Sequence, residues 1–196
     1  MRKLVYYVAV TLDGRIAGPR GEFDFYPMGT PEQAAAYSAA MNERYPETIP
    51  TAARAALGLT DTPNRRFDTV LMGRGAYQPG LDEGMPSPYA HLKQYVISRS
   101  LGRAPSPDVT VVPGHPLRLV RDLKGQDGLD IWLCGGGKLA GTLLPEIDRL
   151  VIKSYPVVAG SGIPAFDTAF TPTHFAPEDR RTFDNGVTVT TYRSTP

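Results

Sequence analysis

The chain has 196 residues, 41% of them hydrophobic, and a formal net charge of +1, which are typical of one globular domain spanning residues 1–196. Basic and acidic residues are interleaved, so nothing indicates a nucleic-acid-binding surface. A single cysteine, Cys134, argues against a disulfide framework and a Cys-x-x-Cys zinc site, and no segment reads as a signal peptide or a membrane span. We therefore expect a cytoplasmic protein with no metal site, no nucleic-acid partner and no membrane contact.

The first part of the chain reads as a strand, a glycine-rich loop and a helix. Residues 4–10 are continuously apolar, which is typical of a strand buried on both faces. Thr30 is a good N-cap for the helix that follows, with Pro31 in its first turn and Gln33 placed for a capping box. Three further elements are expected before the middle of the chain: a short helix over 51–57, a loop over 59–66 and a strand over 67–72.

The second part alternates strands and helices and ends in a hairpin. Asn185-Gly186 is a strong hairpin turn signal between residues 181–184 and 187–192. The other expected elements are strands over 95–98, 109–112, 131–134 and 148–158 and helices over 116–124 and 137–144. This order predicts an α/β fold with a mostly parallel central sheet, flanking helices and a C-terminal antiparallel hairpin.

Gly135, Gly136 and Gly137 stand where a predicted strand turns into a helix. Glycines let a backbone approach a bulky ligand closely, and the free N–H groups at a helix start favour an anion. The less favoured alternative is a tight turn that needs positive φ. A dinucleotide fingerprint is disfavoured because Lys153 and Ser154, not an acidic residue, end the following strand. A Walker loop fails because Leu139 follows Lys138.

Two other predicted strands end in residues that suit a phosphate. Gly73-Arg74 follows one strand, and Ser98-Arg99 ends the other. Because parallel strands open on one edge, these residues would share that edge with the three glycines. Arginine grips phosphate with paired charge-assisted hydrogen bonds. A pyrophosphate at the glycines and a 2′-phosphate at Arg74, Ser98 and Arg99 would together indicate NADPH.

Together these motifs resemble the dihydrofolate reductase superfamily, and most closely its branch containing the reductase domain of bacterial riboflavin synthesis. The similar segments run in the same order over nearly the whole chain. They are residues 6–18 (the "S-L-D-G-x-I-A" region), 70–77 ("G-R-x-T-Y"), 96–99 ("V-x-S-R"), 131–138 ("I-x-G-G-x") and 156–166 ("P-V-x-x-G-x-G-I-P-L-F"). The resemblance implies a dihydrofolate-reductase-like three-layer fold.

The resemblance also implies roles for individual residues. Ala9 and Ile16 would line the nicotinamide, and the loop over 18–28 would act as a lid. The adenosine phosphate end would be held by Gly73, Arg74, Ser98 and Arg99. The pyrophosphate would be held by Gly135, Gly136 and Gly137, with Lys138 nearby.

The proton donor or substrate ligand is left open among Asp13, Asp24, Tyr26 and Glu32. Asp13 could instead fix the turn after the first strand, and Glu32 could simply complement the helix dipole. Lys153 stands where a pterin-site threonine is usual, which makes folate reduction doubtful.

The resulting hypothesis is an NADPH-dependent reductase of a planar heterocyclic, imine or carbonyl compound, similar to 5-amino-6-(5-phosphoribosylamino)uracil reductase. The alternatives are dihydrofolate reductase activity or a non-catalytic, nucleotide-binding dimeric scaffold. The family often pairs protomers, so a homodimer is expected. The insertion over 43–66 could shape a substrate pocket, form an oligomer contact or be a solvated excursion.

Overall fold

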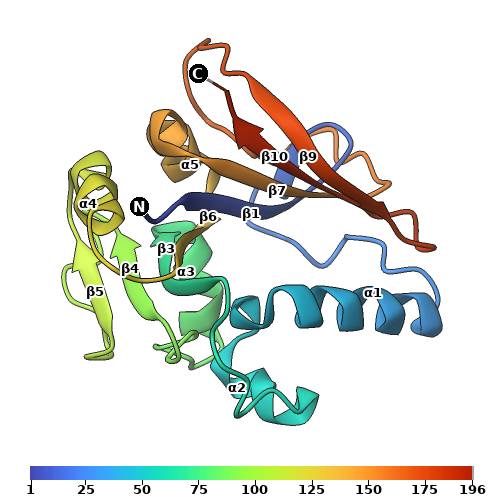
Figure 1. Ribbon diagram of the computed structural model, residues 1–196, viewed down its shortest axis with the longest axis horizontal. Helices are drawn as coiled ribbons and strands as arrows, with labels where there is room; N and C mark the ends of the chain where they lie inside the picture. The colour runs from blue at the N-terminus through green and yellow to red at the C-terminus, as the bar shows by residue number, and fades with distance from the viewer. Residues whose placement is uncertain (196) are drawn as a thin grey trace.

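A computed structural model describes residues 1–195 and contains an eight-stranded sheet covered by helices (Figure 1). The strands of this sheet are β1 (Leu4–Val10), β3 (Phe67–Gly73), β4 (Lys93–Ile97), β5 (Val109–Val112), β6 (Asp130–Gly135), β7 (Arg149–Ser154), β9 (Phe175–Thr182) and β10 (Thr188–Ser194). They lie in the order β5-β4-β3-β6-β1-β7-β10-β9. Neighbouring strands are parallel along the part of the sheet formed by β5, β4, β3, β6, β1 and β7, whereas β10 is antiparallel to β7 and to β9. The predicted fold class is confirmed.

The helices divide between the two faces of this sheet, which makes three layers. They are α1 (Pro31–Arg44), α2 (Thr51–Arg54), α3 (Arg74–Asp82), α4 (Pro116–Lys124) and α5 (Gly137–Leu143), with short 3-10 turns η1 (Pro46–Thr48), η2 (Ala55–Leu57) and η3 (Leu144–Glu146). Thr30 and Gln33 form the predicted capping box at the start of α1. Within residues 1–195, no helix has the length and apolar character that crossing a membrane requires.

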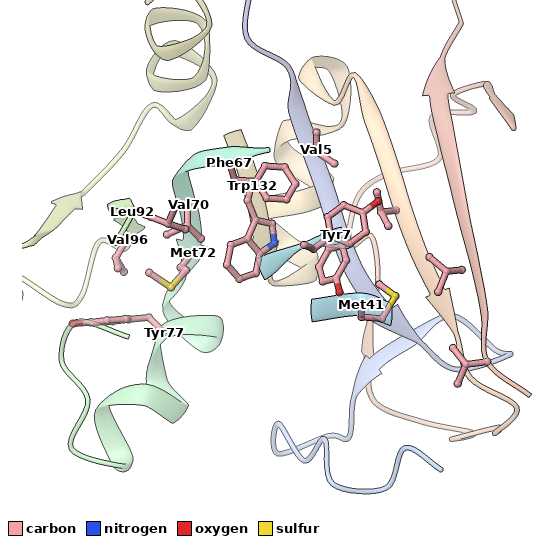
Figure 2. Close-up of a cluster of buried hydrophobic side chains, with 14 of the residues drawn as sticks. Val5, Tyr7, Met41, Phe67, Val70, Met72, Tyr77, Leu92, Val96 and Trp132 are labelled. Atoms are coloured by element: carbon pink, nitrogen blue, oxygen red, sulfur yellow. The ribbon is translucent and has the colours of Figure 1, made fainter. Parts of the chain in front are cut away.

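The face covered by α1 and α3 has a core rich in aromatic side chains. Tyr7 and Trp132 come from neighbouring strands, β1 and β6, and pack with their ring centroids 6.3 Å apart. Met41 of α1 and Tyr77 of α3 close this core from the helix side (Figure 2). The opposite face packs against α4 and α5 through residues such as Leu143. Burial on both faces explains why β1 is apolar at every position.

Three features of the fold differ from the sequence prediction. Helix α3 is missed because Gly75, Pro79 and Gly80 are poor helix formers, and packing of Tyr77 into the core overrides that preference. Strand β7 ends at Ser154, before the predicted end, because Pro156 cannot continue a sheet ladder. The short two-stranded sheet of β2 (Arg15–Ala17) and β8 (Ile163–Pro164) joins segments whose pairing no local pattern indicates.

The insertion over 43–66 is tied to the core by a buried carboxylate. Glu47 is fully buried in η1, and its Oε1 accepts the backbone N–H groups of Arg65 and of Arg66, the latter at 2.7 Å. Arg54, also buried, donates to the carbonyls of Pro46 and Thr62. The insertion is therefore a packed part of the domain.

Replacing Glu47 with alanine is expected to lower the free energy of unfolding by about 2–4 kcal/mol, because two buried N–H groups lose their acceptor. Urea unfolding followed by circular dichroism measures this change. Glu43→Ala, at an exposed position of α1, is the matched control and should stay within about 0.5 kcal/mol of wild type. Equal stability of the two variants would show that Glu47 does not anchor the insertion.

Candidate functional site

The ends of β3 and β6 meet at the carboxyl edge of the sheet. A Cβ added to Gly73 would lie 3.3 Å from the nitrogen of Gly136 and 3.4 Å from the carbonyl oxygen of Gly135. Ile16, on β2, approaches the same glycines, because its Cδ1 would be 3.9 Å from a Cβ on Gly136. Ligands of parallel α/β sheets bind at this edge. The structure thus brings together Ile16, Gly73 and the glycine run, which lie far apart in the sequence.

Arg74 begins α3 at this edge and is partly buried. Its Nη1 is inaccessible to solvent, yet the described residues give it no hydrogen-bond partner. Leaving a guanidinium donor desolvated and unpaired is unfavourable, so the position suits an anionic ligand. Arg99, the second predicted arginine, is exposed after β4.

Ser98 has a structural task within the protein. Its buried Oγ accepts backbone N–H groups from Ser100, at 3.3 Å, and from Leu101, at 3.1 Å. These bonds shape the turn after β4, and the Oγ of Ser98 also lies 3.4 Å from the Oγ of Ser100. Ser98 lies next to the end of β3, since Gly73 is in register with Ile97.

The three glycines of the run have different surroundings. Gly136 is the N-cap of α5, and the peptide between Gly135 and Gly136 is cis. Gly137 is packed against a neighbouring segment, because a Cβ there would lie 2.0 Å from the carbonyl oxygen of Pro164. Lys138 is exposed on the first turn of α5. Gly137 therefore needs to be glycine for packing, whether or not a phosphate binds nearby.

Tyr26 folds the predicted lid loop over the end of β1. Its hydroxyl lies 3.2 Å from the carbonyl oxygen of Ala9 and 3.1 Å from that of Arg15. Its ring packs against Phe25 and Tyr155, each with a centroid distance of 4.7 Å. Burial raises the pKa of Tyr26 to about 12, so the phenol stays protonated near neutral pH. The backbone around Ala9, predicted to line the nicotinamide, is thus covered by this loop.

The predicted carboxyl candidates occupy surface or structural positions. Asp13 accepts the hydroxyl of Thr11 and the N–H groups of Ala159 and Gly160, and these bonds, led by Thr11, lower its pKa to about 2. Asp13 is therefore ionised near neutral pH and joins two loops, which favours the turn-fixing interpretation. Asp24 is exposed.

Glu32 is exposed at the start of α1, where it accepts the hydroxyl of Thr30 at 2.8 Å. This bond is the main cause of its lowered pKa. Its surroundings match the helix-dipole interpretation, and it lies outside the buried face of α1 formed by Tyr37 and Met41.

Lys153, which stands where a pterin-site threonine is usual, is not among the predicted proton donors. It lies on β7, in register with Ala9 of β1, and its ammonium sits 4.1 Å from the ring centroid of Tyr7. Burial is the main cause that lowers its pKa. The sequence signal for this position is that Lys153 alternates with the apolar Val151 and Tyr155, which places the lysine on the same inward side of the strand as these buried residues. Cys134, on the same face, has a thiol pKa raised to about 12 by burial, so it is unreactive near neutral pH.

Solved structures share this architecture. A protein from Shewanella sp. PV-4 described as a riboflavin biosynthesis protein has a TM-score of 0.71, with 23% identity over 99% of both chains. A diaminohydroxyphosphoribosylaminopyrimidine deaminase/5-amino-6-(5-phosphoribosylamino)uracil reductase from Thermotoga maritima has a TM-score of 0.63 and 15% identity, covering 99% of this chain and 57% of that one. Dihydrofolate reductase from Enterococcus faecalis, solved with NADP(H), has a TM-score of 0.61 and 14% identity, over 99% and 97% of the two chains. The fold is that of the dihydrofolate-reductase-like reductases.

The sequence comparisons narrow this class to one family. The model of the RibD C-terminal domain matches residues 2–189. Two uncharacterised proteins of Bacillus subtilis strain 168 are similar: YwjB is 30% identical over 84% of this chain and 83% of its own length, and YyaP is 28% identical over 97% and 94%. The chain belongs to the RibD C-terminal domain family.

Proposed function

We propose that this protein is an NADPH-dependent reductase of a planar heterocyclic, imine or carbonyl compound. The observation that carries the proposal is Arg74, a partly buried guanidinium with an unpartnered Nη1 at the sheet edge where the glycines and Ile16 meet. The Enterococcus faecalis relative solved with NADP(H) and the reductase named in the Thermotoga maritima relative support it.

The residues at this edge fit such a cofactor. Arg74, Gly73, Ser98 and Arg99 would hold the adenosine phosphate end, and Ala9 with Ile16 would line the nicotinamide. Gly135, Gly136 and Gly137 would face the pyrophosphate, with Lys138 supplying a nearby exposed charge. When bound, NADPH would supply a hydride. The protein would position the acceptor beside it and, through the loop carrying Tyr26, exclude water.

A binding titration tests this proposal. Trp132 is the single tryptophan, so quenching of its emission by energy transfer to bound reduced nicotinamide gives the affinity directly. We expect saturable NADPH binding that is at least tenfold tighter than NADH binding, since one charge-assisted phosphate contact contributes about 1.5–3 kcal/mol. Comparable affinity for the two cofactors would contradict the 2′-phosphate assignment, and binding of neither would contradict the reductase function.

Two finer parts of the proposal have separate tests. Oxidation of NADPH by a panel of pterin, pyrimidine and quinone acceptors separates a reductase from a binding scaffold. Dihydrofolate is the least favoured acceptor, because Glu32 is exposed at the first turn of α1. The homodimer remains part of the proposal, and light scattering during size-exclusion chromatography would measure the mass of the assembly.

A further inference from the structure

The buried cations of this protein form ion pairs or hydrogen bonds, whereas the partly buried Lys153 forms neither. Arg2 pairs with Asp68, Arg54 donates to two carbonyls, and Lys124 contacts Asp148 at 2.7 Å. Within residues 1–195, Arg74 and Lys153 are the partly buried cations that have neither an ion-pair nor a hydrogen-bond partner. Nη1 of Arg74 is inaccessible to solvent, and the ammonium of Lys153 is partly buried over the ring of Tyr7, so each cation suits a ligand that brings a negative or electron-rich atom. Arg74 is assigned to the cofactor above, which leaves Lys153.

Lys153 stands on the α1 side of the sheet, beside the residue proposed to line the nicotinamide. Its backbone is in register with Ala9, and its ammonium lies over the face of Tyr7. Trp132 is on the same face and only 3% exposed, and its indole nitrogen has no hydrogen-bond partner. Figure 2 shows that nitrogen on the side of the indole ring toward Tyr7. Two unused N–H donors and two aromatic rings therefore share one face.

The charged group on this face is the ammonium of Lys153, which would repel a cationic ligand. The buried positions of α1 that face the sheet are Tyr37 and Met41, and neither bears a charge. The titratable groups that influence the pKa of Lys153 are Tyr155 and Cys134, and burial raises the pKa of the Cys134 thiol to about 12. The ammonium of Lys153 is a donor without an acceptor group, so a carbonyl oxygen suits this position and an amino group does not.

We propose that Lys153 is the substrate-binding and proton-donating residue of the reductase, and that the substrate presents a carbonyl oxygen to its ammonium group. This inference rests on the proposed function. In the step, the carbon of the acceptor C=N or C=O bond gains a hydride from reduced nicotinamide, which becomes NADP⁺. The π electron pair of that bond moves to nitrogen or oxygen, which takes a proton from the Lys153 ammonium. Water then restores the proton to the amine.

The surroundings of Lys153 suit a proton donor. Burial lowers its pKa from 10.5, which brings the ammonium closer to the acidity that proton transfer near neutral pH requires. The titratable groups around it are tyrosines and a thiol: Tyr7 of β1, Cys134 of β6, Tyr155 of β7, Tyr37 of α1, which accepts a hydrogen bond from Tyr155, and Tyr26, which packs against Tyr155. Turnover should therefore fall as the pH rises through the pKa of Lys153.

Two pteridines that differ only in their polar groups test the binding part. Pteridine-2,4-dione offers carbonyl oxygens, and pteridine-2,4-diamine replaces them with amino groups; the emission of either ring reports binding without NADPH. Wild type should bind the dione at least tenfold more tightly than the diamine. Lys153→Met should lose this preference, whereas Lys153→Arg should keep it. Lys93→Met, at an exposed position of β4, is the matched control and should behave as wild type. An unchanged preference in Lys153→Met, a wild-type preference for the diamine, or no binding of either would overturn the inference.

Turnover tests the proton-donating part, with the dione as the acceptor. Lys153→Arg should bind the dione but oxidise NADPH about 100-fold more slowly, because a guanidinium does not release its proton near neutral pH. The fall of wild-type kcat at high pH should be absent in Lys153→Met. Wild-type turnover by Lys153→Arg, or no oxidation by wild type, would overturn proton donation. NADPH affinity should be the same in wild type and both variants. Failure of wild type to bind NADPH would instead contradict the proposed function, while the pteridine preference still tests Lys153.

Discussion

Arg74→Ala is expected to weaken NADPH binding by about 30-fold while leaving NADH binding within twofold of wild type. The reason is that the guanidinium, whose Nη1 has no protein acceptor, would lose its contact with the 2′-phosphate that only NADPH carries. Arg74→Lys should recover part of the affinity, since it keeps the charge but loses the paired geometry of the guanidinium. Quenching of Trp132 measures all of these affinities.

Arg118→Ala controls for loss of one positive charge, because Arg118 is exposed on α4 and forms a loose pair with Asp122 at 3.8 Å. Its NADPH affinity should match that of wild type. If Arg74→Ala weakened NADPH and NADH equally, Arg74 would act on the fold of the site and not on the 2′-phosphate. If neither affinity changed, the phosphate would bind elsewhere.

Gly137→Ala is expected to destabilise the protein by about 3 kcal/mol or more, lowering the melting temperature by about 6–12 °C. The added Cβ would meet the carbonyl oxygen of Pro164 at 2.0 Å, and backbone atoms cannot move aside as a flexible side chain can. Gly141, one turn further along α5, is packed in the same way against the carbonyl oxygen of Asp167. Helix α5 would have to shift away from this segment. Differential scanning calorimetry measures the change.

Gly75→Ala is the matched control, because Gly75 is exposed on α3 and has nothing within 4 Å of an added Cβ. Since alanine is the better helix former, this variant should be unchanged or more stable by up to about 1 kcal/mol. Equal melting temperatures for the two variants would show that α5 does not depend on close contact at Gly137.

The sequence predicted the elements whose signals are local. The apolar run of β1, the capping box of Thr30 and Gln33 and the Asn185-Gly186 turn each depend on neighbours within a few residues, and each is found in the structure. Helix α3 was missed for the same reason, since its glycines and its proline argue locally against a helix that the burial of Tyr77 stabilises.

From the sequence, the candidate site could be predicted only as a group of residues that each follow an apolar strand. Residues such as Gly73, Ser98 and Gly135 follow apolar strands, so their convergence follows once those strands are parallel. The predicted proton donors, by contrast, were Asp13, Asp24, Tyr26 and Glu32. Asp13 and Glu32 are held in ordinary loop and helix-start hydrogen bonds, while Lys153 lies in strand β7 with its ammonium over the ring of Tyr7.

By itself, the sequence determined the fold class and the order of most elements, because these depend on chemistry encoded over short stretches of chain. Only the tertiary structure decided which polar groups are already satisfied. Asp13 accepts the backbone N–H of Ala159, and Gly137 packs against the carbonyl oxygen of Pro164. Nη1 of Arg74 has no hydrogen-bond partner, and the ammonium of Lys153 contacts the ring of Tyr7 but no anion. The physical reason is that a side chain's partners come from distant segments, and folding alone determines which donors and charges are left for a ligand.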